Sequence, residues 1–551
     1  MIPGKELIFC ALGGSGEIGM NVNLYGCQGK WLMVDLGMTF SGNEYPGVDL
    51  VFADLEFIEN ERENLLGVVL THAHEDHIGA VPYFAQDLGV PLYATPFTAK
   101  LVAAKLEEAG LLNAIELIVV EDLETFQIGP FGVRYVPLAH SIAEGNALLI
   151  DTPYGRIFHT GDWKLDDEPQ IGTPTTQAEL TAIGDEGVLA LVCDSTNVFN
   201  PSASGSEGEV YRGLLEEVRR HEGRRVLVTT FASNVARLQT LGEVARKTGR
   251  ALCVAGRSLD RIIRSGQACG YLKDLPDLID VEEAMDLPRD EVLIVATGGQ
   301  GEPRAALARI SEGTHPIKLE KGDVVLFSSR QIPGNEIAIG RIQNRLAEMG
   351  VEIVTDRQSM IHVSGHPGRP ELEALYSWIR PQILLPVHGE IRHMKEQVRL
   401  GLASGIPKAV FQKNGDLVRL APDHPGKFGE VRSGRLVLDG DIIAPADGEA
   451  MVMRRRLAFN GIVAVAADRK GHVEVSAMGL PLDEDYAAFV EEAKRDVAAA
   501  LAKAKKASHE DRVEVVRLAA RRAATRWSGK KPQVQVLLLE SDDHHQAGRR
   551  K

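Results

Sequence analysis

Five short apolar segments of this chain each end one to four residues before a histidine or an aspartate. The side chains that follow them are His72, His140, Asp162, Asp194 and His388. In sheets covered by helices, functional groups gather just beyond the strand ends. The pattern predicts that these five strand ends meet at one edge of a helix-covered sheet structure.

The interval between Asp194 and His388 is nearly two hundred residues long and has its own secondary-structure pattern. Strand-like segments alternate there with helical patterns such as 234–247 and 335–349, which predicts a parallel α/β unit inserted into the first domain. The Gly/Ser-rich segment 202–208 marks its entry, and the loop near His362 its exit. The strand-like segments are Arg225–Thr230, Leu252–Ala255, Val292–Ala296, Val324–Ser328 and Val351–Thr355.

A last segment follows residues 445–448. Its Ser508-His509-Glu510-Asp511 run is typical of a capping box that opens a helix, and Pro532 ends that helix before the strand 534–539. From Lys494 to Lys531, twelve Lys and Arg residues stand against four acids, which we interpret as a solvated helix face. We expect domains at 1–205 with 362–448, at 206–361 and at 449–551, the last with a disordered tail from Asp542.

Composition narrows the class of protein. A length of 551 residues exceeds one typical domain, and 44% apolar and 25% charged residues are typical of a globular protein. The net charge of −16 argues against nonspecific coating of nucleic acid, but it leaves a nuclease open because local charge matters more. No apolar run reaches the length of a membrane span, and the amino terminus is too short and mixed for a signal peptide, so we expect a cytoplasmic protein.

Two patterns suggest functions that we reject. Gly14–Gly19 matches GxGxxG, but the residues after it indicate two short strands, whereas a dinucleotide-binding loop opens a helix. The cysteines are scattered singly, with no CxxC pair, so we interpret them as core residues rather than as a zinc site or a disulfide framework. They are Cys10, Cys27, Cys193, Cys253 and Cys269.

The segment LTHAHEDHIGA, residues 70–80, places His72, His74, Asp76 and His77 within six residues. Imidazoles and carboxylates suit zinc, manganese or iron. Side chains two residues apart point the same way in extended backbone, so the first two histidines could hold one ion and the other two ligands, nearer a helix, a second. A single histidine is usually a packing or surface group, but four ligands in six residues after a strand favour a metal site. We assign the packing or surface role to His159, His221, His315, His393 and His424.

HxHxDH followed by LAHS, HTGDW and PVHGE resembles the metallo-β-lactamase superfamily, whose fold is an αββα sandwich. By that resemblance His72, His74 and His140 bind one metal ion, Asp76, His77 and His388 bind the other, and Asp162 bridges the two. Two such ions activate water near neutral pH and stabilise both the attacking and the leaving oxygen of a phosphodiester. The fold alone does not name a substrate.

The exit of the insert, His362-Val363-Ser364-Gly365-His366, combines two imidazoles and a hydroxyl with a glycine. Such a loop can approach a phosphate and protonate a departing alkoxide. Ser233-Asn234-Val235 opens the first helix of the insert, and a helix amino terminus can bind a phosphate. Alone, Ser233 is explained about equally well as a plain N-cap; together with the exit loop, phosphate binding is favoured.

These features resemble the β-CASP subgroup of nucleic-acid hydrolases and, over nearly the whole chain, the bacterial ribonuclease J family. The supporting pieces are Asp194-Ser195-Thr196-Asn197, Phe231-Ala232-Ser233-Asn234, Thr297-Gly298-Gly299-Gln300-Gly301-Glu302-Pro303, the HVSGH loop and Arg455-Arg456-Leu457-Ala458-Phe459-Asn460-Gly461. The resemblance implies an α/β protein: an αββα sandwich, an inserted parallel β-CASP domain and a small C-terminal α/β domain. Ala73 and Gly299 stand where glycine and serine are commoner, and neither removes a ligand.

The resemblance also implies roles. Asp76 acts with the metal ions, Asp194 orients a histidine and His366 assists the leaving group. Backbone phosphates would lie on Ser233, Asn234, Val235, His362, Val363, Ser364 and Gly365. Two zinc or manganese ions serve as cofactors, and Asp49 or Asp441 could hold a further structural cation.

The implied activity is hydrolysis of single-stranded RNA from a 5′-monophosphate end in the 5′→3′ direction and at internal sites, in RNA maturation and decay. The implied partners are a second copy in a homodimer or homotetramer and proteins of RNA decay, without a membrane. One alternative is a small-molecule ester or thioester hydrolase, which has no use for the large insert. The other is a noncatalytic subunit of an RNA-decay complex, which the seven intact ligand positions disfavour.

Overall fold

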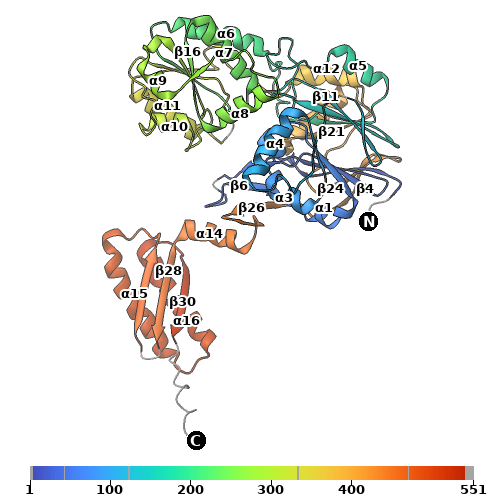
Figure 1. Ribbon diagram of the computed structural model, residues 1–551. Coiled ribbons are helices and arrows are strands. Elements are labelled where there is room, and N and C mark those ends of the chain that lie inside the picture. The colour runs from blue at the N-terminus through green and yellow to red at the C-terminus, as the bar shows by residue number, and fades with distance from the viewer. Residues whose placement is uncertain (1–3, 43, 122–123, 332–333, 469–470, 540–551) are drawn as a thin grey trace. The chain divides into compact units, whose positions relative to one another are not determined.

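The computed structural model describes residues 4–42, 44–121, 124–331, 334–468 and 471–539. The chain divides into two units (Figure 1). The first consists of Met1–Thr39 with Phe52–Gly434, and the second of Phe40–Val51 with Arg435–Lys551. Within the described ranges, no helix has both the length and the apolar character needed to cross a membrane. The predicted disordered tail from Asp542 lies outside the described residues.

Two sheets pack face to face in the first unit. In sheet order, one consists of β25 (Gly426–Glu430), β24 (Asp416–Ala421), β1 (Leu7–Gly13), β3 (Val22–Cys27), β4 (Lys30–Val34), β7 (Leu65–Val69), β8 (Leu92–Ala94) and β9 (Leu117–Val119). The other consists of β10 (Phe126–Ile128), β11 (Phe131–Pro137), β12 (Asn146–Thr152), β13 (Gly155–His159), β14 (Ala190–Asp194), β21 (Ile383–Val387) and β23 (Lys408–Ala409).

Alternation along the strands explains the layers. Leu148 and Ile150 of β12 join the buried cluster that also holds Phe9 of β1, while Leu149 between them packs with α5 (Gln177–Asp185) and α12 (Arg369–Ile379). Successive side chains of a strand point to opposite faces, so a strand buried on both faces is apolar throughout. The helices α3 (Val81–Leu88) and α4 (Pro96–Glu108) accompany the first sheet (Figure 1). The predicted αββα sandwich is confirmed.

The insert is a parallel sheet flanked by helices, as predicted. In sheet order its strands are β17 (Leu278–Ile279), β16 (Ala251–Ala255), β18 (Val292–Ala296), β15 (Val226–Thr229), β19 (Val324–Phe327) and β20 (Glu352–Thr355). Its helices are α6 (Glu207–Arg220), α7 (Val235–Thr248), α8 (Arg257–Ala268), α9 (Val281–Asp286), α10 (Ala306–Ser311) and α11 (Glu336–Glu348). The domain boundaries inferred from the sequence stay predictions.

The insert leaves the sandwich after β14 and returns before β21. These two strands are parallel neighbours, and their register pairs Asp194 with Val387. Residues nearly two hundred positions apart thereby lie side by side, directly before His388.

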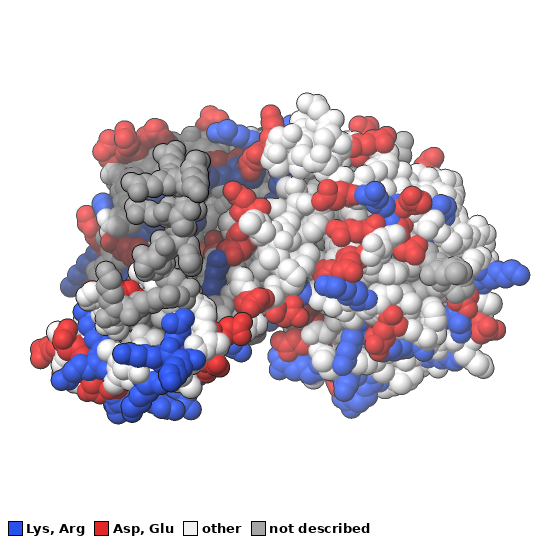
Figure 2. All heavy atoms as spheres, turned by 90° about the horizontal axis from the view of Figure 1, so that it is seen from below, with Lys and Arg blue, Asp and Glu red and all other residues white. Residues whose placement is uncertain are grey.

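The second unit has its own core. Its three-stranded sheet, in the order β29 (Val473–Met478), β28 (Ile462–Asp468) and β30 (Gln533–Leu539), packs against α15 (Tyr486–Lys503) and α16 (His509–Ser528). Ser508 caps α16 by accepting a hydrogen bond from the Asp511 amide at 3.1 Å, as the capping pattern predicts. On the face shown in Figure 2, Lys and Arg side chains gather over part of this unit with Asp and Glu beside them, and both signs of charge are interspersed over the first.

The remaining elements complete the two units. They are β2 (Ser15–Gly16), β5 (Met38–Phe40), β6 (Leu50–Ala53), β22 (Gly389–Glu390), β26 (Arg435–Asp439), β27 (Ile442–Pro445), α1 (Glu56–Asn60), α2 (Glu75–Ile78), α13 (Ile391–Ala403), α14 (Glu449–Asn460), and the 3-10 turns η1 (Arg62–Asn64), η2 (Arg289–Glu291) and η3 (Asp483–Asp485).

Candidate metal centre

The seven predicted metal ligands come together at the strand ends of the sandwich. The ligand that follows β7 is His72, the one after β11 is His140, the one after β13 is Asp162, and the one after β21 is His388. The others lie at the start of α2, with His74 as its N-cap and Asp76 and His77 inside its single turn. Their ligand atoms form two groups, each within 4.8 Å.

The first group joins His72, His74, His140 and Asp162. Nδ1 of His74 lies 3.1 Å from Nε2 of His72 and 3.1 Å from Nε2 of His140. Burial lowers the pKa of His74 to about 4 and that of His140 to about 3, so both rings are neutral near pH 7. His140 Nδ1 donates to the Gly365 carbonyl at 2.7 Å, which leaves its Nε2 lone pair for a cation.

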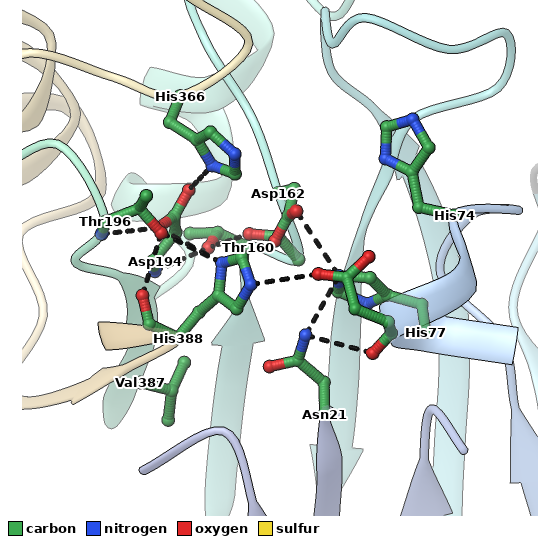
Figure 3. Close-up of polar contacts among 12 residues, drawn as sticks. Asn21, His74, His77, Thr160, Asp162, Asp194, Thr196, His366, Val387 and His388 are labelled. Atoms are coloured by element: carbon green, nitrogen blue, oxygen red, sulfur yellow. Dashed lines mark hydrogen bonds and ion pairs between the residues drawn. The ribbon is translucent and has the colours of Figure 1, made fainter. Parts of the chain in front are cut away.

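The second group joins Asp76, His77, His388 and the same Asp162 (Figure 3). Nε2 of His388 lies 3.1 Å from Asp76 Oδ2, and Nε2 of His77 lies 3.3 Å from Asp162 Oδ2. Burial would lower the pKa of His77, but the carboxylates of Asp162, Asp35 and Asp76 raise it well above its usual value. Carboxylates therefore surround these imidazoles, and their negative charge would stabilise a bound cation.

The donor set fits two divalent cations. Asp162 belongs to both groups, and its buried Oδ1 accepts no hydrogen bond from any described residue. The same oxygen lies 3.2 Å from Nδ1 of His388. A buried carboxylate oxygen that accepts no hydrogen bond is costly, and a bound cation would reduce that cost. Imidazole nitrogens with carboxylate oxygens suit zinc and manganese alike.

The backbone of His388 has an uncommon conformation. The residue has φ 50°, a conformation that is uncommon outside glycine and that clusters at functional sites. Its amide donates to the Gly14 carbonyl at 2.6 Å, and its carbonyl accepts from Thr196 Oγ1 at 2.8 Å. The GxGxxG loop that we excluded as a dinucleotide site therefore supports a candidate ligand, and the described chain after it continues into β3 rather than a helix.

His366 lies beside the metal ligands, paired with Asp194. Its Nδ1 donates to Asp194 Oδ2 at 2.7 Å, and Figure 3 shows the two side chains facing each other next to His388. Burial lowers the pKa of His366, but Asp194 and Asp162 outweigh burial and raise it. A protonated imidazole held by a buried carboxylate is a suitable proton donor.

The HVSGH loop contacts the metal centre directly. Gly365 carries the carbonyl that binds His140, and a Cβ added to Gly365 would lie 2.9 Å from His140 Cε1, so only glycine permits this approach. Ser364 Oγ accepts from the His366 amide at 3.1 Å. Nδ1 of His362 is buried and has no hydrogen-bond partner among the described residues. Burial, with the nearby cations Arg237, Arg330 and Lys164, lowers the pKa of His362 well below its usual value.

At the start of α7 the N-cap is Asn234, not Ser233. Asn234 Oδ1 accepts from the Arg237 amide at 2.9 Å. The alternative role of Ser233 as a plain N-cap is therefore excluded, because the helix begins one residue later, and phosphate binding by Ser233 stays a prediction. Arg237 also donates to the Ile361 carbonyl at 3.1 Å, so the start of α7 lies next to the HVSGH loop.

Four family models match consecutive parts of the chain. They are the metallo-beta-lactamase superfamily at residues 19–178, the ribonuclease J beta-CASP domain at 223–346, the Zn-dependent metallo-hydrolase RNA specificity domain at 350–410 and the ribonuclease J C-terminal domain at 449–541. Ribonuclease J of Sinorhizobium meliloti is 41% identical over 555 residues, covering 98% of both chains. The chain belongs to the ribonuclease J family.

Other ribonucleases J are nearly as similar. That of Mycolicibacterium smegmatis is 39% identical over 83% of this chain and 82% of its own, and that of Thermus thermophilus is 37% identical over 84% and 83%. A solved structure, a protein of unknown function from Enterococcus faecalis V583, matches with a TM-score of 0.54 and 17% identity over 75% of this chain and all of its own, which shows the fold alone. Ribonuclease J relatives, together with the metallo-hydrolase and beta-CASP models, support a metal-dependent ribonuclease.

The two departures from the ribonuclease J patterns leave the site intact. Ala73 is buried between the two histidines of the first group, whose nitrogens still converge. A Cβ added to Gly299 would lie 2.5 Å from Ser329 Oγ, so glycine here lets the two loops pack closely. The residues considered for a further cation, Asp49 and Asp441, are exposed and belong to no cluster of potential ligands in the described parts of the chain.

Sequence reasoning missed one residue of this ribonuclease J site, Asp35. It follows the apolar strand β4 as the other site residues follow theirs, and that signal would have identified it. Its fully buried carboxylate accepts from His77 Nδ1 at 2.7 Å and from the Thr71 amide at 2.8 Å. Such partners orient a metal-binding histidine and raise its basicity.

Replacing Asp35 by asparagine is expected to weaken metal binding about 10- to 100-fold, the range measured for the partners of metal ligands. The amide cannot offer two anionic oxygens to His77 and Thr71. Metal titration of apoprotein measures the affinity, and activity should return at high metal concentration. Asp151→Asn, at an exposed carboxylate of β12, is the control. Unchanged affinity would contradict the orienting role of Asp35.

Proposed function

We propose that this chain removes nucleotides from the 5′-monophosphate end of single-stranded RNA in the 5′→3′ direction and also cleaves at internal sites, in RNA maturation and decay. The observation that carries the proposal is the bond between the Gly365 carbonyl and His140 Nδ1, which seats the HVSGH loop against the metal centre. A metallo-hydrolase for small esters has no need for this loop. The complete set of seven ligands argues against a noncatalytic subunit.

The residues that would hold one zinc or manganese ion are His72, His74 and His140, and those for a second are Asp76, His77 and His388, with Asp162 shared. When bound, two such ions supply an activated water and neutralise charge on the phosphodiester.

The protein side chains bind RNA and move a proton. His366 is placed to donate a proton from Nε2 to the departing 3′-oxygen, because its Nδ1 is held by Asp194. We assign the scissile and neighbouring phosphates to the HVSGH loop, with His362 and Ser364 as side-chain donors and the backbone of Val363 and Gly365 beside them. The start of α7, Ser233-Asn234-Val235, would contribute amide and hydroxyl donors.

A cavity of about 280 Å³ adjoins these groups. Its lining includes His140 and Asn146 of the sandwich and Ala236 and Tyr271 of the insert. It offers room for the end of an RNA strand between the two parts of the first unit. We further propose that the second unit supports a homodimer or homotetramer, and that proteins of RNA decay are partners.

The test uses an RNA carrying a ³²P label in its 5′-monophosphate, alongside the same RNA with a 5′-triphosphate. We expect release of labelled mononucleotide from the first, and a roughly tenfold lower rate on the second. Ser364→Ala is expected to raise KM for the monophosphate RNA about tenfold, because a hydrogen bond to a charged group contributes about 1.5–3 kcal/mol. The control is Ser377→Ala, at an exposed position of α12.

Three outcomes would contradict the proposal. Labelled 5′-terminal fragments longer than one nucleotide, without labelled mononucleotide, would exclude action from the end. Equal rates on the two RNAs would exclude recognition of the monophosphate. Hydrolysis of a thioester with intact RNA would favour the small-molecule hydrolase.

A further inference from the structure

A group of buried charged side chains lies where the chain enters and leaves the insert. Its members, which we call the hinge cluster, are Lys164, Asp166, Glu207, Arg237 and Glu371. Each side chain is at least nine-tenths buried: Arg237 is 0% exposed, Lys164 1% and Glu371 4%. Isolated charges are not buried without a partner, so the arrangement of the partners is informative.

The first contacts join the loop that carries Asp162, which we call the metal loop, to the entry of the insert. Lys164 stands two residues after Asp162, and its amide donates to the Ala139 carbonyl at 2.8 Å, directly before His140. Its ammonium lies 2.8 Å from Asp166 Oδ2 and donates to the Gly205 carbonyl at 3.1 Å. Asp166 in turn accepts from Ser206 Oγ at 2.6 Å and from the Glu207 amide at 3.0 Å. The start of α6 is thereby attached to the loop that carries a metal ligand.

One carboxylate holds both connections at once. Glu371 accepts from the Ser204 amide at 2.8 Å in the entry and from the Gly368 amide at 2.6 Å in the exit. It also accepts from the Leu165 amide at 3.0 Å in the metal loop. Three chain segments that are distant in sequence therefore meet at a single side chain.

The last contacts reach the HVSGH loop. Arg237 donates through Nη2 to both oxygens of Glu207 at 3.1 Å, and through Nη1 to the Ile361 carbonyl at 3.1 Å. The same Nη1 donates to the Ser328 carbonyl at 3.0 Å. Ile361 directly precedes His362, so the position of the HVSGH loop depends on Arg237.

Stability alone does not account for this arrangement. Removing charges from water costs several kcal/mol per ion, and well-packed apolar residues often replace a buried ion pair without loss of stability. What such a network provides is geometry, because each bidentate or forked contact has a narrow range of distances and angles. The contacts run without interruption from the metal ligands to the loop at His362.

We propose that the hinge cluster is a set of positioning residues that holds the HVSGH loop in register with the metal centre. The inference rests on the proposed function only for the choice of RNA as substrate. A shift of about 1 Å between reacting groups, caused by a change distant from the chemistry, can cost about 100-fold in rate. Arg237 therefore acts on RNA through His362, Ser364 and His366, whereas Asp166 and Glu207 also line the cavity that would hold the end of the RNA strand.

The central experiment compares Arg237→Lys with wild type on two substrates. Lysine keeps the charge but cannot bridge Glu207, Ser328 and Ile361 together. We expect kcat on RNA to fall about 10- to 100-fold. Hydrolysis of bis(p-nitrophenyl) phosphate, which needs neither phosphate docking nor leaving-group protonation, should change less than about threefold, with the metal content unchanged. Equal losses on both substrates, or no loss on RNA, would overturn the proposal.

The matched control is Arg250→Lys. Arg250 is also a buried arginine of the insert that donates to three backbone carbonyls, those of Arg224, Val292 and His221. It lies where β18 begins, at the opposite end of the sheet from the hinge cluster. RNA hydrolysis by Arg250→Lys should stay within about threefold of wild type. A loss equal to that of Arg237→Lys would mean that both arginines act only through general stability.

A milder variant and a direct measurement keep the test informative if Arg237→Lys fails to fold. Ser206→Ala leaves all five charges but removes one donor to Asp166 and the hydroxyl that caps α6 by accepting from the Gly208 amide at 3.1 Å. We expect kcat on RNA to fall roughly three- to tenfold and hydrolysis of bis(p-nitrophenyl) phosphate to change less. Hydrogen exchange should quicken in peptides covering 361–368 of Arg237→Lys and stay unchanged in the second unit. Unchanged exchange at 361–368 would contradict the positioning role even if wild type proved inactive on RNA, whereas inactivity on RNA would contradict the proposed function alone.

Discussion

Asp162→Ala is expected to abolish RNA hydrolysis, with kcat/KM falling by at least roughly 10⁴-fold, the scale seen when one member of a catalytic unit is removed. Asp162 is the side chain that both candidate metal groups share. Its loss leaves each group with three ligands. It also removes the one carboxylate that both groups share, so less negative charge is left to stabilise two cations.

Two measurements check this prediction. Elemental analysis of purified protein should show two zinc or manganese ions per chain for wild type and fewer for Asp162→Ala, and the RNA assay gives the rate. Dialysis of wild type against a chelator should reproduce the loss, and added metal should reverse it. Glu186→Gln, at an exposed carboxylate, is the control. Activity above a tenth of wild type with full metal content would contradict the shared role of Asp162.

His366→Ala is the second large effect. We expect kcat on RNA to fall about 10²- to 10⁴-fold, the range for removal of a general acid, with the metal content unchanged. The departing 3′-alkoxide is a poor leaving group without a proton, whereas p-nitrophenolate needs none. Bis(p-nitrophenyl) phosphate hydrolysis should therefore change far less. The control is His424→Ala, at an exposed position of the first unit. Equal losses on both substrates would place His366 among the metal ligands instead.

Asp194→Asn tests the partner of His366. Burial lowers the pKa of His366, and Asp194 is the main group that raises it. A general acid must be protonated, so activity is lost as the pH rises through its pKa. Without the Asp194 charge that pKa falls, and the high-pH limb of the kcat profile is expected to move to lower pH. An unmoved limb would contradict the pairing of His366 with Asp194 in solution.

Local patterns predicted most of the elements correctly because they depend on neighbouring residues. Strand ends before His72, His140, Asp162 and His388 are where the sequence placed them, and the helix capped by Ser508 begins as predicted. At the start of α7 the sequence left a plain N-cap at Ser233 as an alternative, and the structure places the cap at Asn234. Ser and Asn side chains both cap helices, and the choice between adjacent residues depends on backbone angles.

The ligands could be predicted from their density, but their arrangement could not. Four candidate ligands in six residues predict a metal site, whereas the convergence of His140, Asp162 and His388 on that segment depends on sheet order. Asp35 is a second example of a contact that the sequence could not predict. Its strand-end position was visible, but its bond to His77 exists only because β4 and β7 are neighbours.

The sequence by itself determined the kind of chemistry that this protein supports: which side chains stand at strand ends, that a parallel α/β unit is inserted into the first domain, and which family the chain belongs to. Tertiary structure alone decided which of those side chains face one another. The parallel pairing of β14 with β21 joins Asp194 to His388 and His366, and the hinge cluster joins three distant segments through Glu371. The physical reason is that hydrogen bonds and ion pairs act over a few ångströms in space, so they cannot be inferred from the separation of two residues along the chain.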